Sequence, residues 1–157
     1  MLTQIYTYFT IETIYLWLNF GVIPIWLVLI FFPNSKLNKI FLTSIFLPLI
    51  FGLIYVYIFY QLMLLNEDIL DYLSIYSGLD GLADLFTNEL FLLIFWVHFL
   101  AINLFLGSWV SRDALKHNMP KIFSAISLIL IYFTGPIGLI VYWIVRIFFA
   151  KKISLYD

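Results

Sequence analysis

The sequence predicts an all-α, polytopic membrane protein with four transmembrane helices and a short amphipathic surface helix between the second and the third. Two observations support this prediction. Hydrophobic residues make up 64% of the 157 residues and charged residues only 11%, which is too little polar surface for a water-soluble domain. Apolar segments long enough to cross a bilayer also recur along the chain. We expect a single transmembrane domain over residues 1–157.

Composition excludes several classes of function. There is no cysteine, so disulfides and thiolate metal sites are excluded. The two histidines, His98 and His117, do not have the spacing of metal ligands, and we expect no metal. A net charge of −1 gives no support for nucleic-acid binding. Aromatic residues make up 21% of the chain, which is typical of interfacial belts and would also suit the walls around a flat apolar ligand.

The first two spans are predicted over residues 11–32 and 40–65. The first would be about 33 Å long as a helix, which matches a bilayer core. In it Glu12, Asn19 and Trp26 recur every seven residues and therefore share one stripe, which we expect to face the other helices. An interhelical hydrogen bond is the favoured role of Asn19.

An acidic loop follows over residues 66–89. It contains acidic residues and no lysine or arginine, and leucines alternate with the acids in a roughly helical pattern. We predict one or two short amphipathic helices on the membrane surface, with the carboxylates on a solvated face. The acidic residues are Glu67, Asp68, Asp71, Asp80, Asp84 and Glu89.

The last two spans are predicted over residues 90–110 and 122–149. If the third helix continues through Asp113, it brings Asp113 and His117 together at i,i+4. The fourth span is expected to bend at Gly135–Pro136. A re-entrant hairpin is the alternative, but its arms of about 13 residues would be near 20 Å long and too short to span.

Orientation follows from the basic residues. The positive-inside rule places the turns at residues 36–39 and 112–121 in the cytoplasm or its equivalent. Four spans then put both termini on the opposite side, which disagrees with the basic tail at residues 146–152. We expect that tail to pair with the acidic loop.

Three polar residues of the third span are the candidate chemical groups. His98 is predicted to lie near mid-membrane. Its two expected roles, a catalytic base and a residue that pairs helices by a hydrogen bond, are given equal weight. Asn103 is expected to pair helices, and Asp113 to pair with Arg112 or Lys116. About 22 Å of helix separates His98 from Asp113, so the two cannot act as an acid–base pair on one atom.

A longer pattern runs through the third and fourth predicted spans: Trp96-x-His98, Leu100-Ala101-x-Asn103-Leu104-Phe105-x-Gly107-x-Trp109-x-x-x-Asp113, then Gly135-Pro136-x-Gly138 and Tyr142. In this pattern the chain resembles the abscisic-acid-deficient-four family, known from plants for a plastid membrane protein needed to make neoxanthin from violaxanthin, with relatives in bacteria. The family usually has Asp where this chain has Asn103.

The resemblance implies a membrane protein that modifies carotenoids, isomerase-like, at xanthophyll end rings and without a redox cofactor. It implies His98 as base, Asp113 as a group that positions a polar ring end, and Asn103 as the third catalytic position. If the family Asp transfers a proton, Asn103 predicts binding of a carotenoid without conversion by that route. The implied ligand-pocket residues are Asn19, Trp96, Gly107, Trp109, Gly135, Pro136 and Tyr142.

The alternative function is a non-enzymatic carotenoid-binding or assembly subunit of a larger membrane complex. The expected partners are membrane lipids, a carotenoid or similar long apolar ligand, and other copies or subunits. The expected location is a bacterial inner membrane or a plastid-type membrane. A transporter is the third alternative, although we find no convincing internal repeat.

Overall fold

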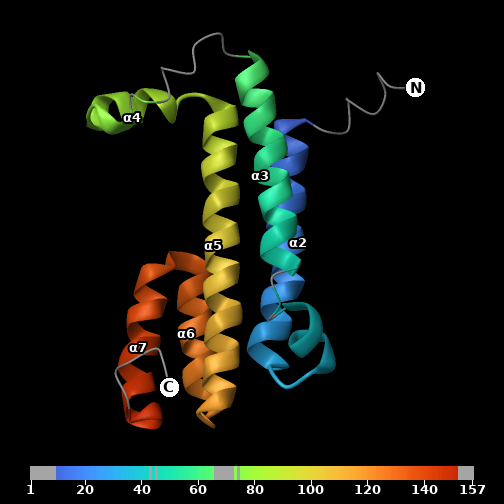
Figure 1. Ribbon diagram of the computed structural model, residues 1–157, viewed down its shortest axis with the longest axis vertical. Helices are drawn as coiled ribbons and strands as arrows, with labels where there is room; N and C mark the ends of the chain where they lie inside the picture. Colours follow the sequence, from blue (N-terminus) through green and yellow to red (C-terminus); the bar gives the residue numbers. More distant parts are fainter. Residues whose placement is uncertain (1–9, 43, 45, 66–72, 74, 152–157) are drawn as a thin grey trace. The chain divides into compact units, whose positions relative to one another are not determined.

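The described part of the chain is mostly helical. The computed structural model describes residues 10–42, 44, 46–65, 73 and 75–151, and among them there is no strand (Figure 1). This confirms the all-α prediction. The elements are α2 (Ile11–Phe31), the π-helix η1 (Asn38–Leu42), α3 (Phe46–Leu65), α4 (Leu79–Leu85), α5 (Glu89–Lys116), α6 (Lys121–Thr134) and α7 (Pro136–Ala150).

Three helices of the described part are long and apolar enough to cross a membrane. They are Ile11–Phe31, Phe46–Leu64 and Glu89–Lys116. They correspond to the first three predicted spans. The second begins later than expected, so that Pro48 lies in the first turn, where its missing N–H costs no hydrogen bond.

The predicted fourth span, residues 122–149, is wrong as a single helix. The segment forms two helices, α6 of 14 residues and α7 of 15 residues. Each is roughly 21–23 Å long, short of the bilayer core. The chain turns at Gly135, whose φ of 59° is outside the helical range. Pro136 then deprives the Tyr132 carbonyl of its i+4 donor and occupies the first position of α7.

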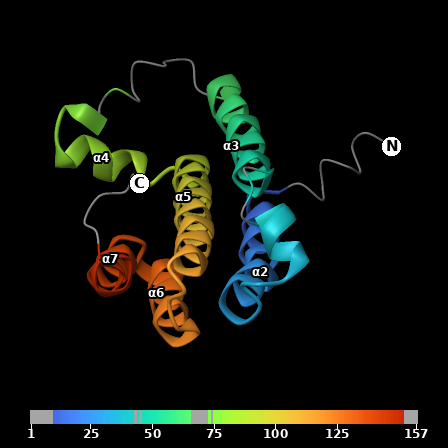
Figure 2. The same ribbon diagram turned by 60° about the horizontal axis from the view of Figure 1, so that its bottom comes forward.

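The two short helices pack as the arms of a hairpin (Figures 1 and 2). Gly138, in the first turn of α7, is buried, and a Cβ added there would collide with the backbone nitrogen of Ile131 in α6. A residue without a side chain therefore allows the arms to approach closely. The segment thus has the hairpin form of the re-entrant alternative, and its insertion in the membrane stays a prediction.

A short helix lies between the second and third long helices, as predicted. It is α4, and none of its residues is buried; Leu79 is 78% exposed. Residues 66–72 and 74 of the acidic loop lie outside the described residues. The location of α4 at the membrane surface stays a prediction.

The chain's internal contacts divide it into two compact units. Unit 1 comprises Met1–Gly21 and Ile50–Leu100, and unit 2 comprises Val22–Leu49 and Ala101–Asp157. The three long helices therefore each contribute residues to both units. This division by contacts does not test whether the chain forms a single transmembrane domain, which stays a prediction.

Unit 2 is held together by close contacts at small residues. Gly107 of α5 faces Trp26 of α2, and a Cβ at Gly107 would lie 2.6 Å from the indole Cη2. The same indole packs edge-on against Tyr132 of α6, with 5.4 Å between ring centroids. Asn38 donates a 3.1 Å hydrogen bond from Nδ2 to the Ser111 hydroxyl, which ties the loop after α2 to α5.

Candidate functional site

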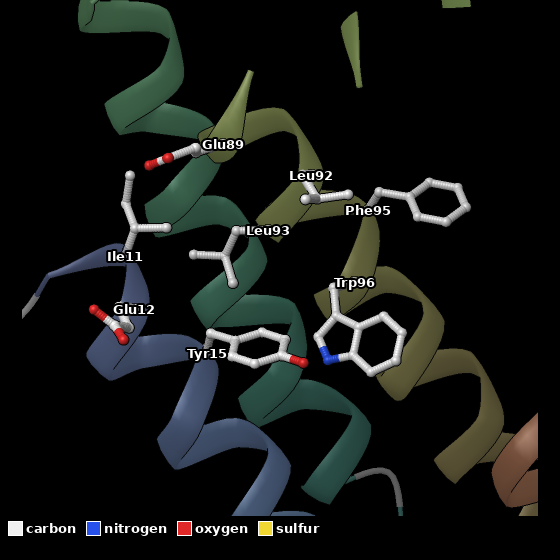
Figure 3. A pocket seen from close by; sticks show the side chains of 8 residues that line it. All are labelled: Ile11, Glu12, Tyr15, Glu89, Leu92, Leu93, Phe95 and Trp96. Carbon is white, nitrogen blue, oxygen red and sulfur yellow. The ribbon is translucent and has the colours of Figure 1, made fainter. Parts of the chain in front are cut away.

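Unit 1 contains a cavity of about 510 Å³ between α2 and α5. This volume is in the range of small-molecule sites, roughly 300–1,000 Å³. The cavity is partly open and mostly apolar, and we name it the ligand groove. It is lined by Ile11, Glu12, Tyr15, Glu89, Leu92, Leu93, Phe95 and Trp96 (Figure 3).

Aromatic rings from both helices meet in the ligand groove. Tyr15 of α2 and Trp96 of α5 have ring centroids 6.1 Å apart. The Trp96 indole N–H donates a 3.2 Å hydrogen bond to Oδ1 of Asn19, which donates from Nδ2 to the Tyr15 carbonyl at 2.7 Å. Phe99 stacks on the Trp96 ring at 5.3 Å. The predicted interhelical bond of Asn19 is confirmed, and it fixes the orientation of Trp96.

Two carboxylates, Glu12 and Glu89, also line the ligand groove. Glu12 precedes Tyr15 by three residues and Glu89 precedes Trp96 by seven, so each shares a helix face with its aromatic residue. Figure 3 shows Glu89 reaching from α5 toward α2, above Ile11. The sequence ranges of unit 1 contain no lysine or arginine, so neither carboxylate has a cationic side chain of its own unit to pair with.

His98 belongs to unit 1 but does not line the ligand groove. Its ring packs against Tyr55 of α3, with 6.2 Å between centroids. The side chain is exposed in the structure. Its role as a base stays a prediction. Asn103 and Asp113, the other two candidate catalytic residues, belong to unit 2.

Asp113 is the centre of a cluster of polar side chains in unit 2, which we name the ion-pair cluster. Its Oδ2 accepts hydrogen bonds of 2.6 Å from the Tyr142 hydroxyl and from Nε of Arg146. His117 Nε2 lies 3.6 Å from Asp113 Oδ1, which confirms the i,i+4 pair. The partner of Asp113 is thus Arg146, and the expectation of Arg112 or Lys116 is wrong.

The ion-pair cluster is enclosed by protein. Tyr142 is fully buried and the Arg146 side chain is 4% exposed, whereas the Asp113 and His117 side chains are 11% and 15% exposed. Arg146 is also the basic residue expected to pair with the acidic loop, and that expectation is wrong for it. Trp109 packs edge-on against Tyr142 at 5.5 Å. A buried and satisfied arrangement of this kind fixes α7 against α5.

The remaining predicted residues meet where α6 ends. Asn103 of α5 is 4% exposed and faces Gly135, where a Cβ would lie 2.6 Å from the Asn103 side-chain oxygen. Asn103 Nδ2 is buried and has no hydrogen-bond partner among the described residues. Pro136 begins α7 beside this contact. Asn103 therefore supports the turn of the hairpin.

Compared with known protein families, residues 13–142 match the ABA DEFICIENT 4-like family. The chain belongs to this family. It is 26% identical over 130 residues to Protein ABA DEFICIENT 4, chloroplastic, of Arabidopsis thaliana. That alignment covers 80% of this chain and 57% of the relative, so the chain spans little more than half the length of that relative. No solved structure matches the chain.

The family's matched range includes every site residue that the sequence predicts, but the structure distributes these residues over two places. Asn19, Trp96 and His98 lie in unit 1, and the other seven lie in unit 2. Sequence reasoning missed Tyr15, Glu89 and Arg146. An arginine inside an apolar helix should have been a signal, because such a charge needs a partner. For Tyr15 and Glu89 the sequence contains no indication of a site beyond their spacing along predicted helices.

Proposed function

We propose that this protein binds a xanthophyll in the membrane and isomerises one of its end rings in the ligand groove. Membership in the ABA DEFICIENT 4-like family supports a role in xanthophyll metabolism. The observation that supports the site is the groove itself, because it combines a mostly apolar lining with aromatic walls and two carboxylates. A xanthophyll end ring has the matching chemistry, an apolar ring with an oxygen function.

The reaction class is an isomerisation of an epoxide to an allenic alcohol. It needs a proton donor at the epoxide oxygen and a base that removes a proton from carbon. The reaction exchanges no electrons with a second reactant. The groove presents groups of both types, a phenol at Tyr15 and carboxylates at Glu12 and Glu89.

The rigid part of the ligand groove is Trp96. Its indole is held on one side by the hydrogen bond to Asn19 and on the other by the stacked ring of Phe99. A flat conjugated ligand gains most from a wall that is already in place, because no side chain has to be ordered on binding. Trp96 is therefore the wall against which the ring stacks.

We further propose a plastid-type membrane as the location, since the Arabidopsis relative is described as chloroplastic. The three long apolar helices agree with integral membrane insertion.

The test uses the full chain in a host that makes epoxidised xanthophylls. Pigments of the membranes and of the detergent-purified protein are separated by chromatography, and their masses are determined by mass spectrometry. We expect a rearranged carotenoid of unchanged mass, which Trp96→Ala reduces at least tenfold. Phe20→Ala is the matched control, because Phe20 lies on α2 in the same unit, is 69% exposed and does not line the groove.

Three results are possible. Formation of the isomer that depends on Trp96 supports the proposal. An unchanged carotenoid that co-purifies with the protein overturns the isomerase and favours the alternative, a pigment-binding subunit. Colourless protein and unaltered membranes in hosts that supply several carotenoids contradict both.

A further inference from the structure

The polar side chains that line the ligand groove supply more hydrogen-bond acceptors than donors. Glu12 and Glu89 each contribute a carboxylate, which accepts hydrogen bonds and donates none. The lining also includes the Trp96 indole N–H and the Tyr15 hydroxyl, but the indole N–H is already bonded to Asn19. The groove therefore matches a ligand whose polar end donates a hydrogen bond.

Both carboxylates are accessible to a ligand in the groove. Glu12 lies in the first turn of α2 and Glu89 in the first turn of α5, where the helix dipole stabilises a negative side chain. Both side chains are exposed, and Figure 3 shows Glu89 reaching from α5 toward α2. A ligand can therefore contact their oxygens without disrupting a buried ion pair.

The sequence ranges of unit 1 are strongly acidic. They contain no lysine or arginine and seven of the nine acidic residues of the chain. This set of charges repels a ligand whose polar end is a carboxylate or a phosphate. An ether or ketone oxygen only accepts hydrogen bonds, so it finds no partner at either glutamate of the groove. A hydroxyl group is neutral and donates a hydrogen bond, and it therefore satisfies both conditions.

We propose that Glu12 and Glu89 select the ligand of the groove by a free hydroxyl group on its end ring. Rings with a hydroxyl then bind more tightly than unsubstituted rings or rings whose hydroxyl is blocked. This inference rests on the function proposed above and names the residues that set its specificity. It assigns no chemical step to either carboxylate.

The length of the ligand is compatible with the separation of the groove residues. Seven residues separate Glu89 from Trp96, which is about 10 Å along α5. A six-membered ring with its hydroxyl, together with an extended glutamate side chain, has about this length. The hydroxyl and the polyene chain of a xanthophyll leave the ring at opposite carbons. A ring stacked on Trp96 can therefore direct its hydroxyl toward the first turns of the two helices.

The experiment measures binding of three pigments to the full chain in nanodiscs, from the absorbance shift of the pigment. β-Carotene has no oxygen, zeaxanthin has a hydroxyl on each end ring, and zeaxanthin dimethyl ether keeps the oxygens but cannot donate. The three have the same carbon skeleton apart from the two methyl caps. None of them has an epoxide, so binding is measured without turnover.

We expect the native protein to bind zeaxanthin about tenfold more tightly than either of the other pigments, as one hydrogen bond to a charged acceptor in an open groove would give. In Glu12→Met/Glu89→Met this ratio should fall to about twofold or less, because methionine has a similar length but no carboxylate. Each single variant should give an intermediate ratio. A ratio between ligands is insensitive to a general loss of folded protein, which affects all three pigments equally.

Asp80→Met/Asp84→Met is the matched control. It removes the same number of carboxylates from unit 1, but both residues are exposed in α4 and neither lines the groove. This control should keep the tenfold preference of the native protein. If it loses the preference as fully as the groove variant, the total charge of unit 1 and not the two lining glutamates sets the selectivity, and the assignment is overturned.

Two further results would contradict the inference. Zeaxanthin and its dimethyl ether could bind the native protein equally, or the groove double variant could keep the tenfold preference; in either case the carboxylates do not read the hydroxyl. Equal binding of all three pigments would overturn the selection alone and leave the carotenoid site in place. Binding of none of them would overturn the proposed function, and this inference with it.

Discussion

The two units of this protein differ in the burial and pairing of their charged side chains. All eight lysines and arginines lie in the sequence ranges of unit 2, and none lies in unit 1. In unit 2, Arg146 and Tyr142 are buried and bonded to Asp113. In unit 1, Glu12 and Glu89 are exposed at a groove, and the sequence ranges of that unit contain no lysine or arginine. Paired, buried charge fixes a structure, whereas accessible charge without a partner is what chemistry requires.

The first way to test this contrast is the membrane topology. If residues 121–150 form a re-entrant hairpin, the ends of α5 and α7 lie on one side of the membrane together with the loop after α2. Every basic residue then lies on the cytoplasmic or equivalent side, and the conflict of the basic tail with the positive-inside rule disappears. A single continuous span would put Lys151 on the side opposite to Lys116.

Single cysteines at Lys36, Lys116 and Lys151 distinguish the two topologies, because the native chain has no cysteine. We expect an impermeant maleimide to label all three from one side of sealed vesicles, and a cysteine at Tyr76 from the other side. The expected difference is all or none. Labelling of Lys151→Cys from the Tyr76 side would refute the hairpin.

The next largest effect concerns stability in unit 2. Arg146→Met leaves the Asp113 carboxylate enclosed without its cation, and we expect it to lower the free energy of unfolding by about 3 kcal/mol. The double variant Asp113→Leu/Arg146→Met should recover more than half of the loss, because no charge is then left unpaired. Glu12→Gln in unit 1 should change stability by less than about 0.5 kcal/mol.

Circular dichroism during denaturation in detergent measures these differences. Equal stabilities of Arg146→Met and Glu12→Gln would remove the distinction between the two units. A double variant less stable than either single variant would show that the ion pair itself, rather than the avoidance of an unpaired charge, stabilises unit 2.

The two units also differ in how tightly the chain packs around a helical glycine. Gly138→Ala forces a Cβ into the Ile131 backbone, which cannot rotate away, so we expect a loss of about 1–3 kcal/mol. Gly21→Ala meets no atom within 4 Å, and in a helix interior it should gain about 0.5–1 kcal/mol. The same denaturation assay reports both. A neutral Gly138→Ala would mean that the arms of the hairpin are further apart.

The sequence predicts these features to different depths. The three long helices follow from apolar length alone, and the contact of His117 with Asp113 follows from helix periodicity. The hairpin does not follow from the sequence, because Gly135–Pro136 predicts only a bend. The reversal of the chain becomes evident from the packing of Gly138 on Ile131. The ligand groove could not be predicted from the sequence either. Glu12 and Glu89 come from helices far apart in the chain, and each alone has the pattern of a solvated charge.

Asn103 is a buried polar residue of unit 2 whose Nδ2 has no partner among the described residues. A donor left in this state destabilises the folded protein, so Asn103→Leu, which keeps the branch at Cγ, should raise the free energy of unfolding by about 1 kcal/mol. Ser127→Ala is the matched control. Ser127 is fully buried, but its hydroxyl donates to the Phe123 carbonyl, so its loss should not stabilise. If Asn103→Leu is instead destabilising, Nδ2 has a partner such as an internal water, and Asn103 then belongs with the paired polar groups of unit 2.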